Sequence, residues 1–133
     1  MIKIPESIFQ GIIEHARRQW PLECCGILAG EENTVKRSFE MTNSEQSAVR
    51  YSMAPHDQLR AYDEMDREGM EMVAIYHSHP HTIPFPSETD VELAVLPELV
   101  SIIVSLKQKE EPVVRAFRIS KEAIHIEEIE VNP

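Results

Sequence analysis

The stretch from residue 70 to residue 90 reads MEMVAIYHSHPHTIPFPSETD, and it decides how the rest of the chain is interpreted. Its first part, Met70–Tyr76, becomes apolar toward its end, which is typical of a β-strand that enters a core. This strand leads directly into His77-Ser78-His79. Because residues i and i+2 of a strand point to the same side, His77 and His79 are expected to aim at one point.

The second part of the stretch turns the chain back toward the two histidines. Three prolines within residues 80–86 predict an irregular loop. Ser87 is a favourable N-cap and Asp90 follows three residues later, as in a capping box, so a helix is expected from Ser87 to about Leu96. Asp90 then lies in the first turn of that helix, where its carboxylate can approach both imidazoles.

Two imidazoles and one carboxylate form a ligand set that zinc accepts. Zinc prefers four ligands, so His77, His79 and Asp90 would leave one position open for water, which distinguishes a catalytic site from a structural one. Bound zinc lowers the pKa of water to about 7 and so supplies a nucleophile at neutral pH. The stretch therefore predicts one zinc ion per chain and hydrolytic chemistry.

Outside this stretch, helical and strand patterns alternate around one core. The helical patterns are at 6–19 and 55–69, and the strand patterns are at 25–29, 35–41, 51–53, 99–106, 113–119 and 123–131. Residues 30–34 are expected to form a turn, and the alternation of the last strand slips near residues 127–128, which suggests a bulge. The expected fold class is α/β, with a single domain over residues 1–133 and a mixed β-sheet flanked by helices.

Composition limits the classes of partner. The chain has 133 residues, 42% of them apolar and 27% charged, as in a globular protein of one domain. The net charge of −10 disfavours nucleic acid and anionic membrane surfaces as partners. No apolar run approaches the roughly 18 residues that span a bilayer, and the first residues lack a secretory signal, so a cytoplasmic location is expected.

The remaining cysteines and histidines are expected to have ordinary roles. A disulfide between the neighbours Cys24 and Cys25 would be strained, so both are expected to be reduced and buried, which fits a reducing compartment. His81 lies in the proline-rich loop, where strand geometry has ended, and is expected to contact substrate or solvent rather than metal. The other histidines are expected on the surface: His15, His56 and His125. Two aromatic residues are expected in the core: Trp20 and Tyr76.

Amide hydrolysis also requires a base that takes a proton from water and delivers it to the leaving amine. Glu23 is the candidate, because it stands at the mouth of the strand expected at 25–29. By position alone it is one of 19 glutamates, and a plain surface role is the alternative. Ser87 could donate a hydrogen bond to a developing oxyanion, serve only as the N-cap, or do both.

Together these residues resemble the JAMM/MPN+ metalloproteases, which carry an upstream glutamate, then His-Ser/Thr-His-Pro, a short loop and Ser-x-x-Asp. The match consists of Glu23 in a Glu-x-Cys-Gly context, residues 77–80, Ser87 and Asp90, and the resemblance extends over essentially the whole chain. It implies zinc ligation by His77, His79 and Asp90. It further implies Glu23 as general acid/base, Ser87 as oxyanion stabiliser, and the MPN/JAB fold, which is cytidine-deaminase-like.

Enzymes of this family typically cleave after the C-terminal Gly-Gly of a ubiquitin-like protein. The chain resembles short bacterial members, including those that release cysteine or another small amine from a ubiquitin-like sulfur carrier. The resemblance implies a partner with an extended C-terminal tail, which would pair as an added strand. Because the core carries no insertions that could hold a second large protein, the sulfur carrier is favoured; the oligomeric state stays open.

Four alternatives have to be weighed against this interpretation. A deubiquitinase-like isopeptidase would act on other ubiquitin-like conjugates. A non-catalytic MPN scaffold would usually lack the ligands that this chain keeps. A base deaminase needs His-x-Glu with Pro-Cys-x-x-Cys, and neither occurs here. A cell-wall peptidase would share the chemistry but would need export.

Overall fold

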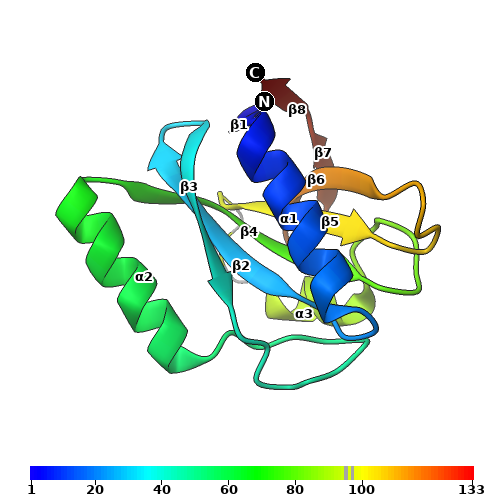
Figure 1. The fold of residues 1–133 in the computed structure, drawn as a ribbon. Helices are drawn as coiled ribbons and strands as arrows, with labels where there is room; N and C mark the ends of the chain where they lie inside the picture. Colours follow the sequence, from blue (N-terminus) through cyan, green and yellow to red (C-terminus); the bar gives the residue numbers. More distant parts are fainter. Residues whose placement is uncertain (95, 97) are drawn as a thin grey trace.

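The computed structural model describes residues 1–94, 96 and 98–133. Within them lie three helices, α1 (Glu6–Gln19), α2 (Pro55–Glu68) and α3 (Glu88–Leu93). The strands are β1 (Ile2–Pro5), β2 (Cys25–Glu31), β3 (Thr34–Met41), β4 (Glu71–His79), β5 (Val100–Ser105), β6 (Val113–Ile119), β7 (Ile124–Glu127) and β8 (Ile129–Asn132). They form one mixed sheet in the order β7-β6-β5-β4-β2-β3-β1-β8, flanked by the helices (Figure 1), and this confirms the expected α/β class.

The helices cover opposite faces of the sheet. Helix α1 packs through Ile12 and Ala16 onto one face, whereas α2 and α3 contribute to the apolar clusters on the other face. Strand β4 lies in the middle, antiparallel to β2 and parallel to β5. Its residue Tyr76 belongs to the cluster under α1, and Ile75 packs with the cluster under α2. Because side chains alternate along a strand, His77 and His79 share the face of Ile75.

The two edges of the sheet are joined through a single residue. The sequence pattern at 123–131 predicts one bulged strand, but the chain breaks at Glu128 into β7 and β8, which pair with β6 and β1 at opposite ends of the sheet. The backbone N–H of Ile2 donates to the carbonyl of Glu128 (2.8 Å), so β1 pairs with the last segment of the chain. The slip in alternation thus marks a change of partner strand rather than a bulge.

Other boundaries also differ from the prediction. The turn between β2 and β3 is tighter than residues 30–34, because both strands extend and Glu32 takes a left-handed conformation (φ 54°). Residues 51–53 make only an isolated bridge, Asn43–Met53, instead of a strand. The last helix ends at Leu93, with Ala94 as its C-cap. Its expected continuation to about Leu96 passes through residue 95, which is outside the described residues.

Two side chains occupy environments opposite to those expected. His15, expected on the surface, is only 2% exposed, because it lies on the buried face of α1, and its Nδ1 is 2.7 Å from the Tyr76 hydroxyl. Trp20, expected in the core, follows the end of α1 and is 38% exposed. The Lys109 ammonium lies 3.2 Å from the centroid of its ring. Tyr76 is buried as expected.

Gly26 is required by the packing of Tyr76. The two residues are register partners on β2 and β4, and a Cβ built on Gly26 would lie 2.2 Å from Cε2 of the Tyr76 ring. His15 holds the hydroxyl of that ring, so the ring cannot move away freely. We therefore expect Gly26→Ala to lower the free energy of unfolding by about 3 kcal/mol, the upper part of the range for overpacked cores.

The measurement for Gly26→Ala is urea unfolding followed by circular dichroism. Gly11→Ala is the matched control, because a Cβ at Gly11 meets nothing within 4 Å and alanine is the better helix former, so this variant should be equally or more stable than wild type. Equal unfolding midpoints for the two variants would contradict the packing argument.

Candidate metal centre

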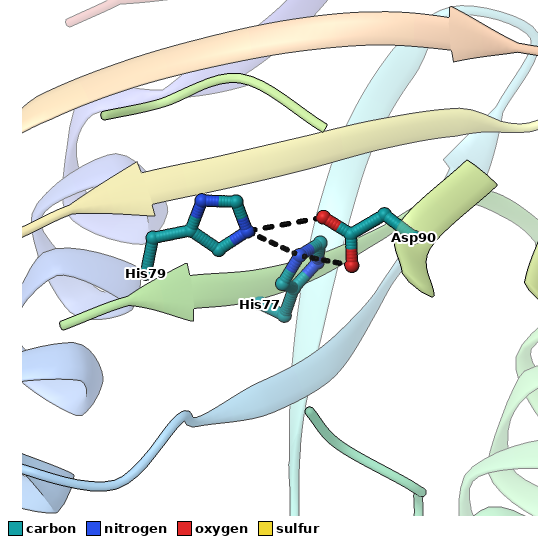
Figure 2. A group of neighbouring side chains, drawn as sticks. All are labelled: His77, His79 and Asp90. Carbon is teal, nitrogen blue, oxygen red and sulfur yellow. Dashed lines mark hydrogen bonds and ion pairs between the residues drawn. The ribbon is translucent and has the colours of Figure 1, made fainter. Parts of the chain in front are cut away.

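Three ligand-type side chains converge at the end of β4. Figure 2 shows His77 and His79 projecting from this strand toward Asp90, which comes from the start of α3. The two Nε2 atoms are 3.2 Å apart. Oδ1 of Asp90 lies 3.2 Å from Nε2 of His77, and Oδ2 lies 3.0 Å from Nε2 of His79. One ligand atom from each residue therefore falls within 4.8 Å of the others.

Local sequence rules place the carboxylate. Ser87 is the N-cap of α3, and its Oγ accepts a hydrogen bond from the backbone N–H of Asp90 (3.1 Å). In return, Oδ2 of Asp90 accepts from the backbone N–H of Ser87 (2.9 Å). This capping box starts the helix and at the same time fixes the rotamer of Asp90 beside the imidazoles.

Backbone contacts also determine which nitrogen of His79 faces the centre. Its Nδ1 lies 2.9 Å from the carbonyl oxygen of Ile83. A carbonyl only accepts, so Nδ1 carries a proton and Nε2 is the atom that faces Asp90. Burial lowers the pKa of His79, but its hydrogen bonds to Asp90 and Ile83 outweigh burial and raise it. Burial lowers the pKa of His77, with Asp90 opposing that shift, and so favours its neutral form. The Nε2 atoms of both imidazoles and the Asp90 carboxylate thus face one point, an arrangement that suits a cation.

The spacing of these atoms fits zinc. Tetrahedral ligands at about 2.0–2.1 Å from zinc are separated from one another by about 3.3 Å. The two Nε2 atoms are 3.2 Å apart, and each lies within 3.2 Å of a different oxygen of Asp90. With one ligand atom taken from each residue, the three atoms lie within 4.8 Å of one another, and the group is consistent with a zinc site of the JAMM type.

Glu23 lies beside this group and is buried, with 3% of its surface exposed. Burial raises the pKa of its carboxyl to about 8; His79 opposes this shift and Asp90 adds to it, so Glu23 is within electrostatic reach of both. Its Oε1 has no hydrogen-bond partner among the described residues. A divalent cation at the centre would lower the pKa of Glu23 toward neutrality.

The neighbouring cysteines do not belong to the candidate metal centre. Cys24 and Cys25 are both buried and free, as expected. Burial raises the pKa of each thiol to about 12, which keeps both protonated. The backbone of Cys24 has a structural role, because its N–H donates to Oγ of Ser78 (2.8 Å) and its carbonyl accepts from the Ser78 N–H (3.1 Å). These bonds join the start of β2 to the end of β4.

Sequence reasoning missed an aromatic side chain that lines the site, Tyr51. Tyr51 stacks on His77, with ring centroids 4.6 Å apart and an interplanar angle of 25°. The stretch at 51–53 carries only a short strand pattern, so no local signal connects Tyr51 with His77. His81, in contrast, is outside the group of three, as expected; it is exposed, and its ring contacts the edge of Trp20 (5.6 Å between centroids).

Comparison with known proteins decides the family. Residues 5–120 match the model described as prokaryotic homologs of the JAB domain. The chain belongs to this family. This JAB-family chain is 35% identical to the CysO-cysteine peptidase of Mycobacterium tuberculosis over 133 residues, which cover 98% of the chain and 91% of that protein. It is also 35% identical over 103 residues to the desampylase of Haloferax volcanii, covering 75% of the chain and 74% of that protein.

Solved structures agree with this assignment. A protein from Desulfitobacterium hafniense superposes with a TM-score of 0.91 at 35% identity, covering 99% of the JAB-family chain and 93% of that protein. A JAB1/MPN domain protein from Archaeoglobus fulgidus superposes with a TM-score of 0.66 at 21% identity, covering 98% and 97%, and supports the fold alone. The resemblance to the JAMM metallopeptidases is thereby confirmed.

Among the described residues, no helix has the length and apolar character needed to cross a membrane.

Proposed function

We propose that this chain is a zinc-dependent peptidase that hydrolyses the amide bond after the C-terminal Gly-Gly of a ubiquitin-like sulfur carrier and releases cysteine or another small amine. Residues 1–133 would act as one catalytic domain. The observation that carries the proposal is the convergence of His77, His79 and Asp90 beside the buried Glu23. The substrate class rests on the 35% identity to CysO-cysteine peptidase over 98% of the chain.

In the proposed enzyme, His77, His79 and Asp90 hold zinc. Zinc supplies Lewis acidity, which activates water as a nucleophile at neutral pH. Glu23 takes a proton from the attacking water and delivers it to the leaving amine. Its environment suits both steps, because burial opposes ionisation of the carboxyl whereas a nearby cation favours it. A carboxyl whose pKa is balanced in this way can accept and release a proton near neutral pH.

Ser87 can stabilise the oxyanion without giving up its capping role. Its Oγ accepts from the Asp90 N–H through a lone pair, which leaves the hydroxyl proton to be donated. One preorganised donor of this kind is worth about 3 kcal/mol in the transition state. Ser87 is exposed, so a substrate carbonyl can approach it from solvent.

A groove beside the site supports an extended tail as the substrate. Its volume is about 450 Å³, and its walls include Tyr51, Ile75 and Leu93. Because Tyr51 also stacks on His77, this apolar groove reaches the metal centre. A narrow Gly-Gly end would fit between such walls. The free thiols of Cys24 and Cys25 support a cytoplasmic location for the reaction.

Incubation of the zinc-loaded protein with a carrier whose C-terminal glycine is joined to cysteine tests the function. We expect mass spectrometry to detect the carrier ending in Gly-Gly together with free cysteine, and we expect a chelator to abolish and zinc to restore the reaction. An isopeptide-linked protein conjugate of the same carrier should be cleaved more slowly. Absence of both reactions in a zinc-loaded sample would contradict the proposal and favour the scaffold. Ammonia released from cytidine would indicate a deaminase.

A further inference from the structure

The side chain of Asn43, just after β3, has every hydrogen-bonding position filled. Its Oδ1 accepts from the backbone N–H groups of Glu45 and Ser52, each at 3.0 Å. Its Nδ2 donates to the carbonyl oxygens of Glu23 and Arg50, each at 3.1 Å. An asparagine amide has two donors and one oxygen with two lone pairs, so no capacity is left unused. The pairing also fixes which side of the amide is oxygen, because carbonyls only accept and N–H groups only donate.

These bonds connect three parts of the candidate metal centre. Asn43 closes the segment 44–52 into a loop, aided by a bond from the Ser44 N–H to the Ser52 carbonyl (2.9 Å). The loop carries Tyr51, which stacks on His77. It also holds Glu23, whose N–H donates to the carbonyl of Ser47 (2.8 Å). Asn43 therefore connects Glu23, the proposed general base, with the loop and with Tyr51, which lines the candidate metal centre.

We propose that Asn43 is a positioning residue for the hydrolysis, which fixes the backbone of Glu23 and thereby aims its carboxylate. This inference rests on the proposed function. Glu23 precedes β2, so the sheet ladder does not hold its backbone; Ser47 and Asn43 supply the bonds to its N–H and C=O. Its Oε1 is buried with no partner among the described residues, so backbone placement has a large share in the aim of the carboxylate. A displacement of about 1 Å in a reacting group costs about 100-fold in rate.

Two substitutions affect the link to Glu23 and the closure of the loop to different extents. Asn43→Asp keeps an oxygen that accepts from Glu45 and Ser52, but it loses both donated bonds and places a carboxylate oxygen against the carbonyl of Glu23. We expect its kcat to fall about 100-fold, with KM within about threefold and zinc content unchanged. Asn43→Ala loses all four bonds. Because Tyr51 and Ser52 also line the groove, this variant should raise KM as well as lower kcat.

Amide hydrogen exchange followed by NMR gives a readout that does not need activity. In Asn43→Asp, the Glu23 amide should exchange at least about tenfold faster than in wild type, while the Ser52 amide keeps its protection. In Asn43→Ala both amides should lose protection. Asn33→Asp is the matched control, because Asn33 is exposed in the β2–β3 turn, and this variant should resemble wild type in every measurement.

The outcomes separate this inference from the proposed function. Unchanged exchange at Glu23 in Asn43→Asp would overturn the inference, whether or not the wild type cleaves the carrier conjugate. Wild-type kcat in Asn43→Asp would overturn it as well, and equal loss of protection at Glu23 and Ser52 would reduce Asn43 to a structural role. Failure of the wild type itself to cleave any carrier conjugate would instead contradict the proposed function.

Discussion

Glu23→Gln is expected to bind zinc like the wild type and to lose at least about 1000-fold in kcat on the carrier–cysteine conjugate. General acid–base catalysis contributes about 10²–10⁴-fold, and glutamine has the same shape as glutamate but cannot take a proton from water. The backbone bonds of Glu23 to Ser47 and Asn43 do not involve the carboxylate, so they persist in the variant. Zinc content by mass spectrometry and steady-state kinetics are the two measurements.

Glu92→Gln is the control for Glu23→Gln, because Glu92 is exposed on α3, and its activity should equal that of the wild type. A wild-type rate in Glu23→Gln would show that another group is the base.

Stability gives an independent check in the metal-free protein. The pKa of Glu23 is about 8 in the folded chain and about 4.5 in the unfolded chain, so ionisation destabilises the fold as pH rises between these values. Relative to wild type, Glu23→Gln should gain stability from pH 5 to pH 9.

His79→Ala is expected to lose both zinc and turnover. The substitution removes one of three protein ligands, so its effect on zinc affinity should exceed the about 10–100-fold that the loss of an outer partner costs. Competition against a chromophoric chelator measures the affinity, and mass spectrometry measures the zinc content. Retention of one zinc per chain by His79→Ala would rule out His79 as a ligand.

His81→Ala is the matched control for His79→Ala. His81 is two residues further along the chain, exposed and against the ring of Trp20 rather than near Asp90. We expect its zinc affinity to equal that of the wild type. A loss of zinc in His81→Ala comparable to that in His79→Ala would mean that the proline-rich loop supplies a ligand.

The sequence predicts the convergence of His77, His79 and Asp90 because two short-range rules produce it. Alternation along β4 places His77 and His79 on one side, and the capping box at Ser87 returns Asp90 in the first turn of α3. Both rules act over a few residues and do not depend on the rest of the fold. The apolar periodicity of 6–19 predicts α1 for the same reason, and its bounds agree with the structure.

Features that depend on distant partners escape prediction from the sequence. Strand β1 is four residues long and carries no signal of its own, because only its pairing with β3 and β8 makes it a strand. The break at Glu128 is visible in the sequence as a slip in alternation, but the slip does not tell which strand the chain joins next. The stacking of Tyr51 on His77 and the bond from Asn43 to Glu23 are tertiary, and no periodic pattern accompanies them.

X-ray absorption spectroscopy of the zinc-loaded protein tests most directly whether His77, His79 and Asp90 hold the ion. We predict one zinc per chain, only nitrogen and oxygen neighbours at about 2.0–2.1 Å, and the scattering signature of two imidazoles, reduced in His79→Ala. A sulfur shell at about 2.3 Å, or a spectrum unchanged by His79→Ala, would place the ion elsewhere and contradict the account.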